Sequence, residues 1–262
     1  MTIRTYPVVF VGAGPGDPDL ITVKGQQALM NADLVIYAGS LVPEAVLKWV
    51  KPKTTVLNSA SMHLDEIIKE IGAGYREGKR VLRLHTGDPS LYGAIFEQMA
   101  RLNELSIPYR IIPGVTAAFA AAASMGIEYT LPEISQSLIF TRMSGRTPVP
   151  ETESLKSLAS HKTSMVIYLS ITLIDKVAEI LKKAYGEDSV CAVAFRVSQP
   201  EEKIIFTRLS RLNEVVKKEK ITHQSLIIVG KILNLTENRA EYRSKLYDKD
   251  FTHQYRYCRD SN

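Results

Sequence analysis

A glycine-rich turn near the start of the chain is its first candidate for ligand chemistry. The apolar run 8–11 is followed by a turn in which glycine alternates with other residues, at Gly12, Gly14 and Gly16. A dinucleotide-binding loop needs the spacing G-x-G-x-x-G, and Asp17 stands where the third glycine would be. A phosphate-binding G-x-x-x-x-G-K-[ST] loop is absent from the sequence as well. The turn therefore predicts a close backbone turn on an α/β sheet that serves some other ligand.

The end of this turn is typical of the start of a helix. Asp17 suits the N-cap, and Pro18 suits the first helical turn, where its missing N–H costs nothing. We therefore expect a helix over residues 20–30, which is compatible with a ligand site beside it.

Two more glycine-containing turns follow apolar runs in the first half of the chain. Thr86-Gly87-Asp88-Pro89 comes after residues 81–84, and Pro113-Gly114-Val115-Thr116-Ala117 comes after residues 110–112. Ligands of open α/β sheets collect outside the carboxyl ends of the strands. Taken singly, each turn is also explained as punctuation between a strand and a helix. Together, the three turns predict one shared crevice.

The elements that must position these turns alternate along the first half. Apolar strands are expected at residues 8–11, 34–37, 81–84 and 110–112. Between these strands, apolar residues recur with helical spacing, which predicts helices. Two examples are the sets Leu64, Ile67, Ile68 and Ile71, and Leu91, Ile95, Met99 and Leu102. An Ala-rich segment covers residues 117–124. This alternation favours a mostly parallel sheet covered by helices.

The second half has its own set of elements. Strands are expected at residues 137–141, 165–169, 190–195, 203–207 and 226–229, with a helical face at Ile174, Val177, Ala178 and Leu181. Only a short turn at Gln199-Pro200 separates two of these strands, which predicts a hairpin and hence a mixed sheet. We expect an α/β domain over residues 1–133, a second α/β domain over 134–235 and a charged tail over 236–262.

Composition excludes several classes of protein. The 262 residues are 45% hydrophobic, which is typical of a globular protein, and no apolar run is long enough to span a membrane. The net charge of +5 suits an anionic partner, but the basic residues are dispersed, which argues against nucleic acid. We expect no metal site and no disulfide, because Cys191 lies in an apolar stretch and Cys258 in a polar tail, far apart. Without a signal-like start, the expected location is the cytoplasm.

The motifs resemble those of one family. Val11-Gly12-Ala13-Gly14-Pro15-Gly16-Asp17-Pro18-Asp19-Leu20, then Gly87-Asp88-Pro89, then Pro113-Gly114-Val115-Thr116-Ala117 are similar to the tetrapyrrole methylases, which use S-adenosylmethionine. The segments 37–42, 142–151 and 244–253 narrow the resemblance to members that methylate carbon 11 of precorrin-4 or cobalt-precorrin-4 in cobalamin biosynthesis. The family implies two αβα domains with a cofactor trough between them, an anionic tetrapyrrole substrate and a homodimer.

The resemblance also implies a set of cofactor contacts. In the first domain they are Pro15, Gly87, Asp88, Leu91, Thr116 and Ala117, and in the second Leu169, Ala194, Gln224, Ser225 and Leu226. Asp88 is the best candidate for a specific polar contact. For Leu169 and Leu226 a place in the core is an equally good interpretation.

Methyl transfer from a sulfonium depends on orienting the two reactants and excluding water more than on acid–base groups. His85 and Tyr92, on either side of the Gly-Asp-Pro turn, are candidates for a general base, although His85 also suits a structural role. Arg142 and Arg146 lie in a loop and could pair with substrate carboxylates or simply face solvent.

Other functions stay open at this point. Another tetrapyrrole methylase is the nearest alternative, and the tail and the loop 142–151 argue against it. A nucleotide-binding oxidoreductase is disfavoured by the failed G-x-G-x-x-G spacing. A binding module without catalysis is the third possibility.

Overall fold

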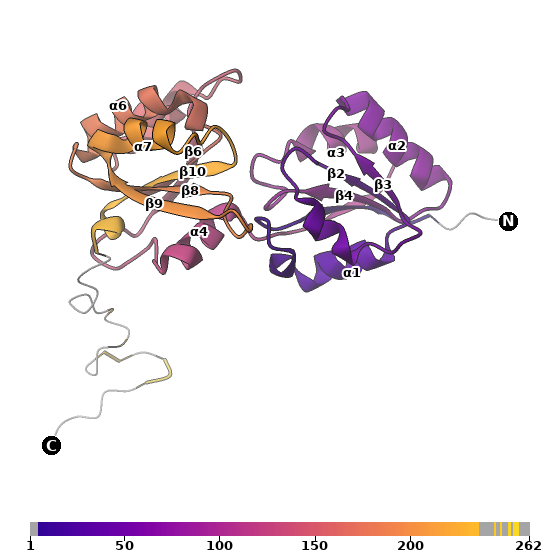
Figure 1. Cartoon of the computed structure of the whole chain (residues 1–262). Coiled ribbons are helices and arrows are strands. Elements are labelled where there is room, and N and C mark those ends of the chain that lie inside the picture. Colours follow the sequence, from indigo (N-terminus) through magenta and orange to yellow (C-terminus); the bar gives the residue numbers. More distant parts are fainter. Residues whose placement is uncertain (1–4, 236–243, 245–246, 248–250, 253, 257–262) are drawn as a thin grey trace. The chain divides into compact units, whose positions relative to one another are not determined.

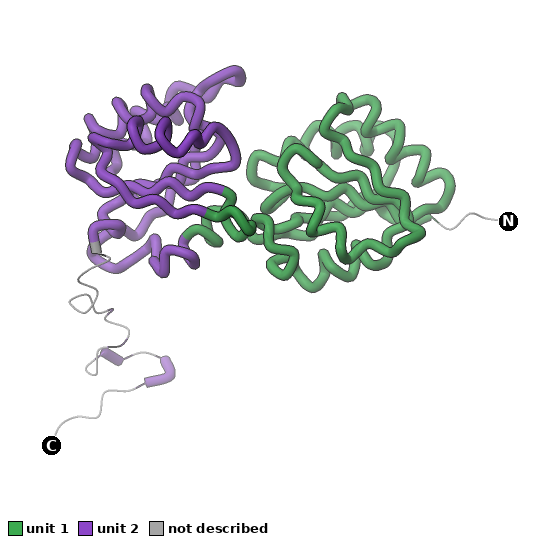
Figure 2. The backbone as a smooth tube through the Cα atoms, in the orientation of Figure 1, with its two compact units in different colours: residues 1–121, 196–202 green, residues 122–195, 203–262 purple. Residues whose placement is uncertain are grey.

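A computed structural model describes residues 5–235, 244, 247, 251–252 and 254–256 (Figure 1). The chain forms two compact units, residues 1–121 with 196–202 and residues 122–195 with 203–262 (Figure 2). The domain boundaries expected from the sequence stay a prediction. Most of the expected tail over 236–262, including His253 and Cys258, lies outside the described residues.

The first unit is built on a five-stranded, fully parallel sheet in the order β3-β2-β4-β1-β5. Its strands are β1 (Val8–Gly12), β2 (Leu34–Tyr37), β3 (Thr55–Asn58), β4 (Val81–His85) and β5 (Tyr109–Ile112). The predicted parallel sheet is confirmed. The edge strand β3 was not predicted, because three of its four residues are exposed and it carries no apolar run.

Helices cover both faces of this sheet. On one face α1 (Val23–Asn31) and the 3-10 helix η2 (Glu44–Trp49) pack on β1 and β4 through Leu29, Val46 and Leu82. On the other face α2 (Leu64–Arg76) and α3 (Ile95–Glu104) pack through Ile71 and Leu102. The apolar spacing predicted for α2 therefore corresponds to its buried side.

The second unit contains a five-stranded mixed sheet in the order β6-β7-β10-β8-β9. Its strands are β6 (Leu138–Arg142), β7 (Ser164–Tyr168), β8 (Val190–Phe195), β9 (Lys203–Arg208) and β10 (Ser225–Val229). Only β6 and β7 are parallel; β7, β10, β8 and β9 pair antiparallel in turn. The predicted hairpin of β8 and β9, and with it the mixed sheet, is confirmed.

Helices also flank this second sheet (Figure 1). One face packs against α5 (Leu155–Ala159), α6 (Ile174–Tyr185) and α7 (Leu212–Lys218), which share a core with β7, β8 and β10. The helix α4 (Ala117–Met125) and the 3-10 helix η6 (Lys231–Leu235) lie toward the other face. Cys191 is fully buried and unpaired in the shared core, where burial raises the pKa of its thiol to about 12. The short helices α5 and α7 were not predicted.

The start of the first helix differs from the prediction. Asp17 does cap a helix, but that helix is the single 3-10 turn η1 (Pro18–Leu20), in which the Asp17 carboxylate accepts a hydrogen bond from the Asp19 N–H. The longer helix α1 has its own cap, Thr22, whose hydroxyl accepts from the Gly25 N–H at 3.1 Å. Two capping residues five positions apart split the predicted helix into two.

The turn between β8 and β9 belongs to the first unit. Residues 196–202 group with residues 1–121 rather than with the strands that they connect. The second unit also contains three short 3-10 helices, which are η3 (Glu151–Glu153), η4 (Ile171–Leu173) and η5 (Leu209–Arg211). No helix in the described part of the chain is both long and apolar enough to cross a membrane.

Candidate active site

The three glycine turns of the first unit meet at the carboxyl ends of β1, β4 and β5. Gly14 and Gly87 exchange two backbone hydrogen bonds, with the Gly87 N–H donating at 2.8 Å and the Gly14 N–H at 3.3 Å. The Ala13 N–H also donates to the carbonyl of His85 at 2.7 Å. The Gly14–Gly87 pair is an isolated antiparallel bridge just past the ends of the parallel strands β1 and β4, and it joins the first two turns into one structure.

The third turn approaches so closely that only glycine fits. A Cβ on Gly12 would lie 2.6 Å from the N and Cα atoms of Gly114 and 2.5 Å from the Gly87 carbonyl oxygen. A Cβ on Gly114 would lie 2.8 Å from the Cα of Gly12. Real Cβ atoms do not approach backbone this closely, so the glycines are required by contact between the turns. The sequence could not distinguish this requirement from a turn conformation.

Asp88 ties two of the turns together. Its Oδ2 accepts from the Gly114 N–H at 2.9 Å, and its Oδ1 accepts from the N–H and the hydroxyl of Ser90. Burial alone would raise the pKa of Asp88, but the hydrogen bonds from Ser90 and Gly114 hold this pKa below its ordinary value. Asp88 therefore stays ionised and fixes the position of the third turn, in addition to any ligand contact.

The turn 196–202 adds a contact that the sequence did not suggest. The Asp17 N–H donates to the Ser198 hydroxyl at 2.9 Å, and Gly16 lies against the side chain of Gln199. Arg196 and Ser198 have positive φ angles of 46° and 63°, which are uncommon for residues with a Cβ. Residues far away in the sequence thus border the first glycine turn, and no local signal marks them.

The predicted first-unit contacts lie in or beside these turns. Pro15 and Thr116 are buried, whereas Gly87, Leu91 and Ala117 are half-buried. Leu91, expected on a helix, lies before the start of α3, because α3 begins only at Ile95, after Ala94 in a left-handed conformation. Leu91 thereby belongs to the turn rather than to the helix.

The two candidates for a general base line one cavity of about 310 Å³ on the α2 and α3 side of the sheet. His85 is buried, and burial together with the neighbouring positive charge of Arg83 lowers the pKa of His85 to about 3. A histidine with this pKa is neutral at physiological pH and is a weak base. Tyr92 is 42% exposed and has a φ of 56°. The structure thus favours a hydrogen-bonding role for His85.

The predicted second-unit contacts gather where the inner strands β7 and β8 end and β10 begins. Ala194 and Leu226 are direct register partners, and β10 begins at Ser225 beside the end of β7. Leu226 and Ala194 are buried, whereas Leu169 is 62% exposed, so a core role for Leu169 is wrong. Leu169 and Gln224 have positive φ angles of 53° and 46°. Such backbone outliers cluster at binding sites.

Ser225, the first residue of β10, adds an unusual feature to this group. Its Oγ is buried and has no hydrogen-bond partner in the part of the chain that the structure describes. Buried polar atoms are nearly always hydrogen-bonded, so an orphaned hydroxyl is a place where a ligand atom would fit.

The two arginines that were expected in a loop are not equivalent, because Arg142 is the last residue of β6 and only Arg146 lies in the loop. Arg142 donates from Nη1 to the Thr147 carbonyl at 3.0 Å and from Nη2 to the Pro148 carbonyl at 2.7 Å. Its guanidinium therefore holds its own loop in place. Arg146 is exposed and makes no such bond within the described residues. Of the pair, Arg146 is the one available to a substrate.

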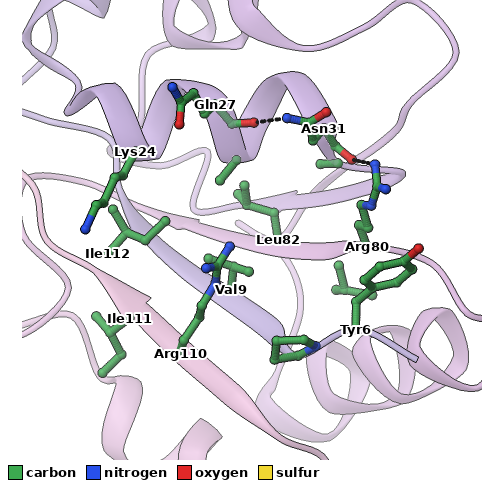
Figure 3. Close-up of a pocket in the computed structure, with 14 residues that line it drawn as sticks. Tyr6, Val9, Lys24, Gln27, Asn31, Arg80, Leu82, Arg110, Ile111 and Ile112 are labelled. Atoms are coloured by element: carbon green, nitrogen blue, oxygen red, sulfur yellow. Dashed lines mark hydrogen bonds between the residues drawn. The ribbon is translucent and has the colours of Figure 1, made fainter. Parts of the chain in front are cut away.

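A second cavity, of about 630 Å³, lies away from the glycine turns on the α1 side of the first sheet (Figure 3). Lys24 of α1, Arg80 before β4 and Arg110 of β5 reach into it. Arg80 donates to the Asn31 carbonyl at 3.4 Å, and its guanidinium lies 4.9 Å from the ring centre of Tyr6. None of the residues singled out from the sequence lines this larger cavity.

Comparison with known proteins assigns the chain to a family. Residues 7–213 match the family model of the tetrapyrrole (corrin/porphyrin) methylases. Over 250 residues the chain is 50% identical to a cobalt-precorrin-4 C(11)-methyltransferase of Methanocaldococcus jannaschii, with 95% of each chain covered. The chain belongs to the tetrapyrrole methylase family. This finding confirms the resemblance drawn from the glycine turns.

Solved structures of other tetrapyrrole methylases share its fold. The cobalamin biosynthetic enzyme cobalt precorrin-4 methyltransferase, CbiF, is 45% identical, with a TM-score of 0.84 over 86% of this chain and 95% of that one. A uroporphyrin-III C-methyltransferase of Thermus thermophilus in complex with S-adenosyl homocysteine is 25% identical, with a TM-score of 0.72 over 88% and 94%. These likenesses confirm the predicted fold and do not favour an oxidoreductase.

Proposed function

We propose that this tetrapyrrole methylase transfers a methyl group from S-adenosylmethionine to carbon 11 of precorrin-4 or cobalt-precorrin-4, in cobalamin biosynthesis. The observation that carries the proposal is the 50% identity, across 95% of both chains, with a cobalt-precorrin-4 C(11)-methyltransferase.

The residues of both units fit an adenosylmethionine cofactor. The first unit offers three tightly packed glycine turns, held together at Gly12 and Gly114, and an ionised Asp88. The second unit offers the orphaned Oγ of Ser225 and the exposed Leu169. The structure of the Thermus thermophilus relative with S-adenosyl homocysteine supports this choice of cofactor. We propose that the cofactor contacts come from these glycine turns and from the residues at the end of β7 and the start of β10.

The chemistry expected of the chain is mainly positional. Bound S-adenosylmethionine supplies an electrophilic methyl group. The turns are held rigidly by the hydrogen bonds of Gly14, Gly87 and Gly114, so little reorganisation is needed on binding. Leu169 offers an apolar surface that excludes water. Because the pKa of His85 is about 3, any proton lost from the substrate passes to another group or to solvent.

The direct test is methyl transfer by the purified full-length protein. Precorrin-4 and cobalt-precorrin-4 are each incubated with ¹³C-methyl S-adenosylmethionine, and the position of the new methyl is read by NMR. Label at carbon 11 of either substrate supports the proposal. Label at another ring carbon would instead assign the chain to a sibling methylase, and no transfer to either tetrapyrrole would refute the proposed activity.

Calorimetry separates the remaining classes. Titration with S-adenosylhomocysteine should give saturable binding, and titration with NAD should give none. The reverse pattern would restore the oxidoreductase alternative. We also propose a homodimer, from the family resemblance, and a cytoplasmic location. A single monomer mass in light scattering at micromolar concentration would contradict the dimer.

A further inference from the structure

The cavity that contains His85 also contains a buried cation. This space of about 310 Å³, named here the Arg83 cavity, lies at the carboxyl end of β4. Its walls are the segment after β2, the segment between β3 and α2, and the residues from Leu91 to Gln98. All of these residues belong to the first unit, so the cavity is complete within that unit.

Arg83 is only 4% exposed, in the middle of β4. Its Nε donates to Oε1 of Gln98 at 3.1 Å, and its Nη1 donates to the carbonyl of Ile36 at 3.1 Å. Both partners are neutral, and Nη2 has no partner among the described residues. Burial lowers the pKa of Arg83 to about 10, so the guanidinium still carries its charge at neutral pH.

The surroundings of Arg83 supply no matching negative charge. The acid that lines the cavity, Glu97, is exposed and forms no ion pair with Arg83 in the described part of the chain. His85 stacks with Phe10 at a ring distance of 6.0 Å, and its buried Nε2 also lacks a hydrogen-bond partner there. An ionised donor and an unsatisfied imidazole nitrogen therefore line the same small space.

A buried Arg83 charge beside an unpaired His85 nitrogen is unfavourable unless a ligand binds to both groups. Buried charges in proteins are normally paired, because removing an ion from water is energetically unfavourable unless an opposite charge or hydrogen bonds replace the water. A guanidinium presents its N–H groups as a planar fork that matches a carboxylate. A neutral histidine can donate a further hydrogen bond to the same group.

We propose that the Arg83 cavity binds one carboxylate side arm of the tetrapyrrole substrate, with Arg83 as its counter-ion and His85 as a second donor. The inference rests on the proposed function, because that function supplies a substrate that carries carboxylate arms. The proposal assigns substrate binding to a residue inside a strand, in addition to Arg146. A purely mechanical role, in which Arg83 only links β2 and α3, is the alternative that the experiment must separate.

The first test removes the charge and measures binding of a stable probe, uroporphyrin III, by absorption titration of the full-length protein. Arg83→Met should weaken binding by about tenfold or more, the scale of losing a hydrogen bond to a charged group. Arg110→Gln is the matched control, since it removes one positive charge from an exposed residue of the same sheet that has no ion pair there. This control should bind within about threefold of wild type.

The second test leaves Arg83 intact and closes the cavity. Ala60 lines the cavity and is exposed, so Ala60→Phe fills the opening. Ser61 is its exposed neighbour and does not line the cavity, which makes Ser61→Phe the matched control. Ala60→Phe should weaken uroporphyrin III binding by about tenfold, and Ser61→Phe should not. Ala60→Phe and its control Ser61→Phe therefore test binding in the cavity even if Arg83→Met fails to fold.

Folding and cofactor binding are followed in every variant by thermal melting and by calorimetry with S-adenosylhomocysteine. A variant Arg83→Met that melts earlier yet binds the porphyrin like wild type would show the mechanical role and overturn the proposal. Equal losses in Arg83→Met and Arg110→Gln would also overturn it, because they would indicate long-range attraction. Porphyrin binding needs no methyl transfer, so these outcomes are independent of whether the proposed activity is found.

Discussion

His85 should make the first unit sensitive to mild acid. Its pKa is lowered from 6.5 to about 3 by burial and by the charge of Arg83. In the unfolded chain the same imidazole takes up a proton near its ordinary pKa. Between these two values the unfolded state binds one more proton than the folded state. The free energy of unfolding therefore falls as the pH falls through 6.5, and continues to fall until the pH reaches about 3.

The size of the effect follows from the two pKa values. Between the two pKa values, each unit of pH changes the free energy of unfolding by about 1.4 kcal/mol, and this dependence sets in gradually around pH 6.5. Lowering the pH from 7.5 to 5 should therefore cost the first unit about 2 kcal/mol through His85 alone. Such a loss is a sizeable part of the stability of an ordinary domain.

The assay is urea unfolding at several pH values, followed by the fluorescence of Trp49, the single tryptophan of the chain, which lies in the same unit as His85. The variant His85→Gln keeps a polar side chain of similar reach but cannot titrate in this range. Its stability should change less between pH 7.5 and 5 than that of wild type, by about 2 kcal/mol. His161→Gln, at an exposed position of the second unit, serves as the control for the substitution itself.

Equal pH dependence in wild type and His85→Gln would refute the reasoning. That result would mean that the His85 ring is hydrated in the folded state or is protonated there at pH 5. NMR of ring-labelled histidine gives an independent reading, since the His85 ring should stay neutral at pH 5.

Three further predictions concern the turns and the loop. Gly114→Ala should lower the free energy of unfolding by about 3 kcal/mol, because the new Cβ meets backbone, whereas Gly145→Ala meets only Leu173 at 3.5 Å and should be nearly neutral in urea unfolding. Asp88→Ala should weaken S-adenosylhomocysteine binding in calorimetry by more than about 1 kcal/mol, and unchanged affinity in a folded variant would remove Asp88 from the site. Replacing Arg142 and Arg146 together with lysine should raise KM for the tetrapyrrole and leave cofactor affinity unchanged; a wild-type KM would show that the guanidinium fork is not used.

Local sequence patterns predicted much of this fold. Apolar runs identified every strand of the two sheets except β3, and the helical period of apolar residues identified the buried face of α2. The short Gln199-Pro200 connection predicted a hairpin, since no crossover helix fits between two strands so close in sequence. The order of the glycine turns was enough to identify the family, since each turn is a contiguous motif.

Other features depend on which distant segments touch, and only the tertiary structure decided them. The glycines at 12 and 114 are required because two turns about a hundred residues apart along the chain press backbone against backbone. Leu169 looks like a core residue in sequence, yet it lies exposed where β7 ends. Arg83 reads as one polar residue in an apolar strand, and only the packing of α3 over the sheet shows that its charge is buried beside an open cavity. Local periodicity reports the environment of one element, whereas burial of a charge and contact between turns are properties of several elements packed together.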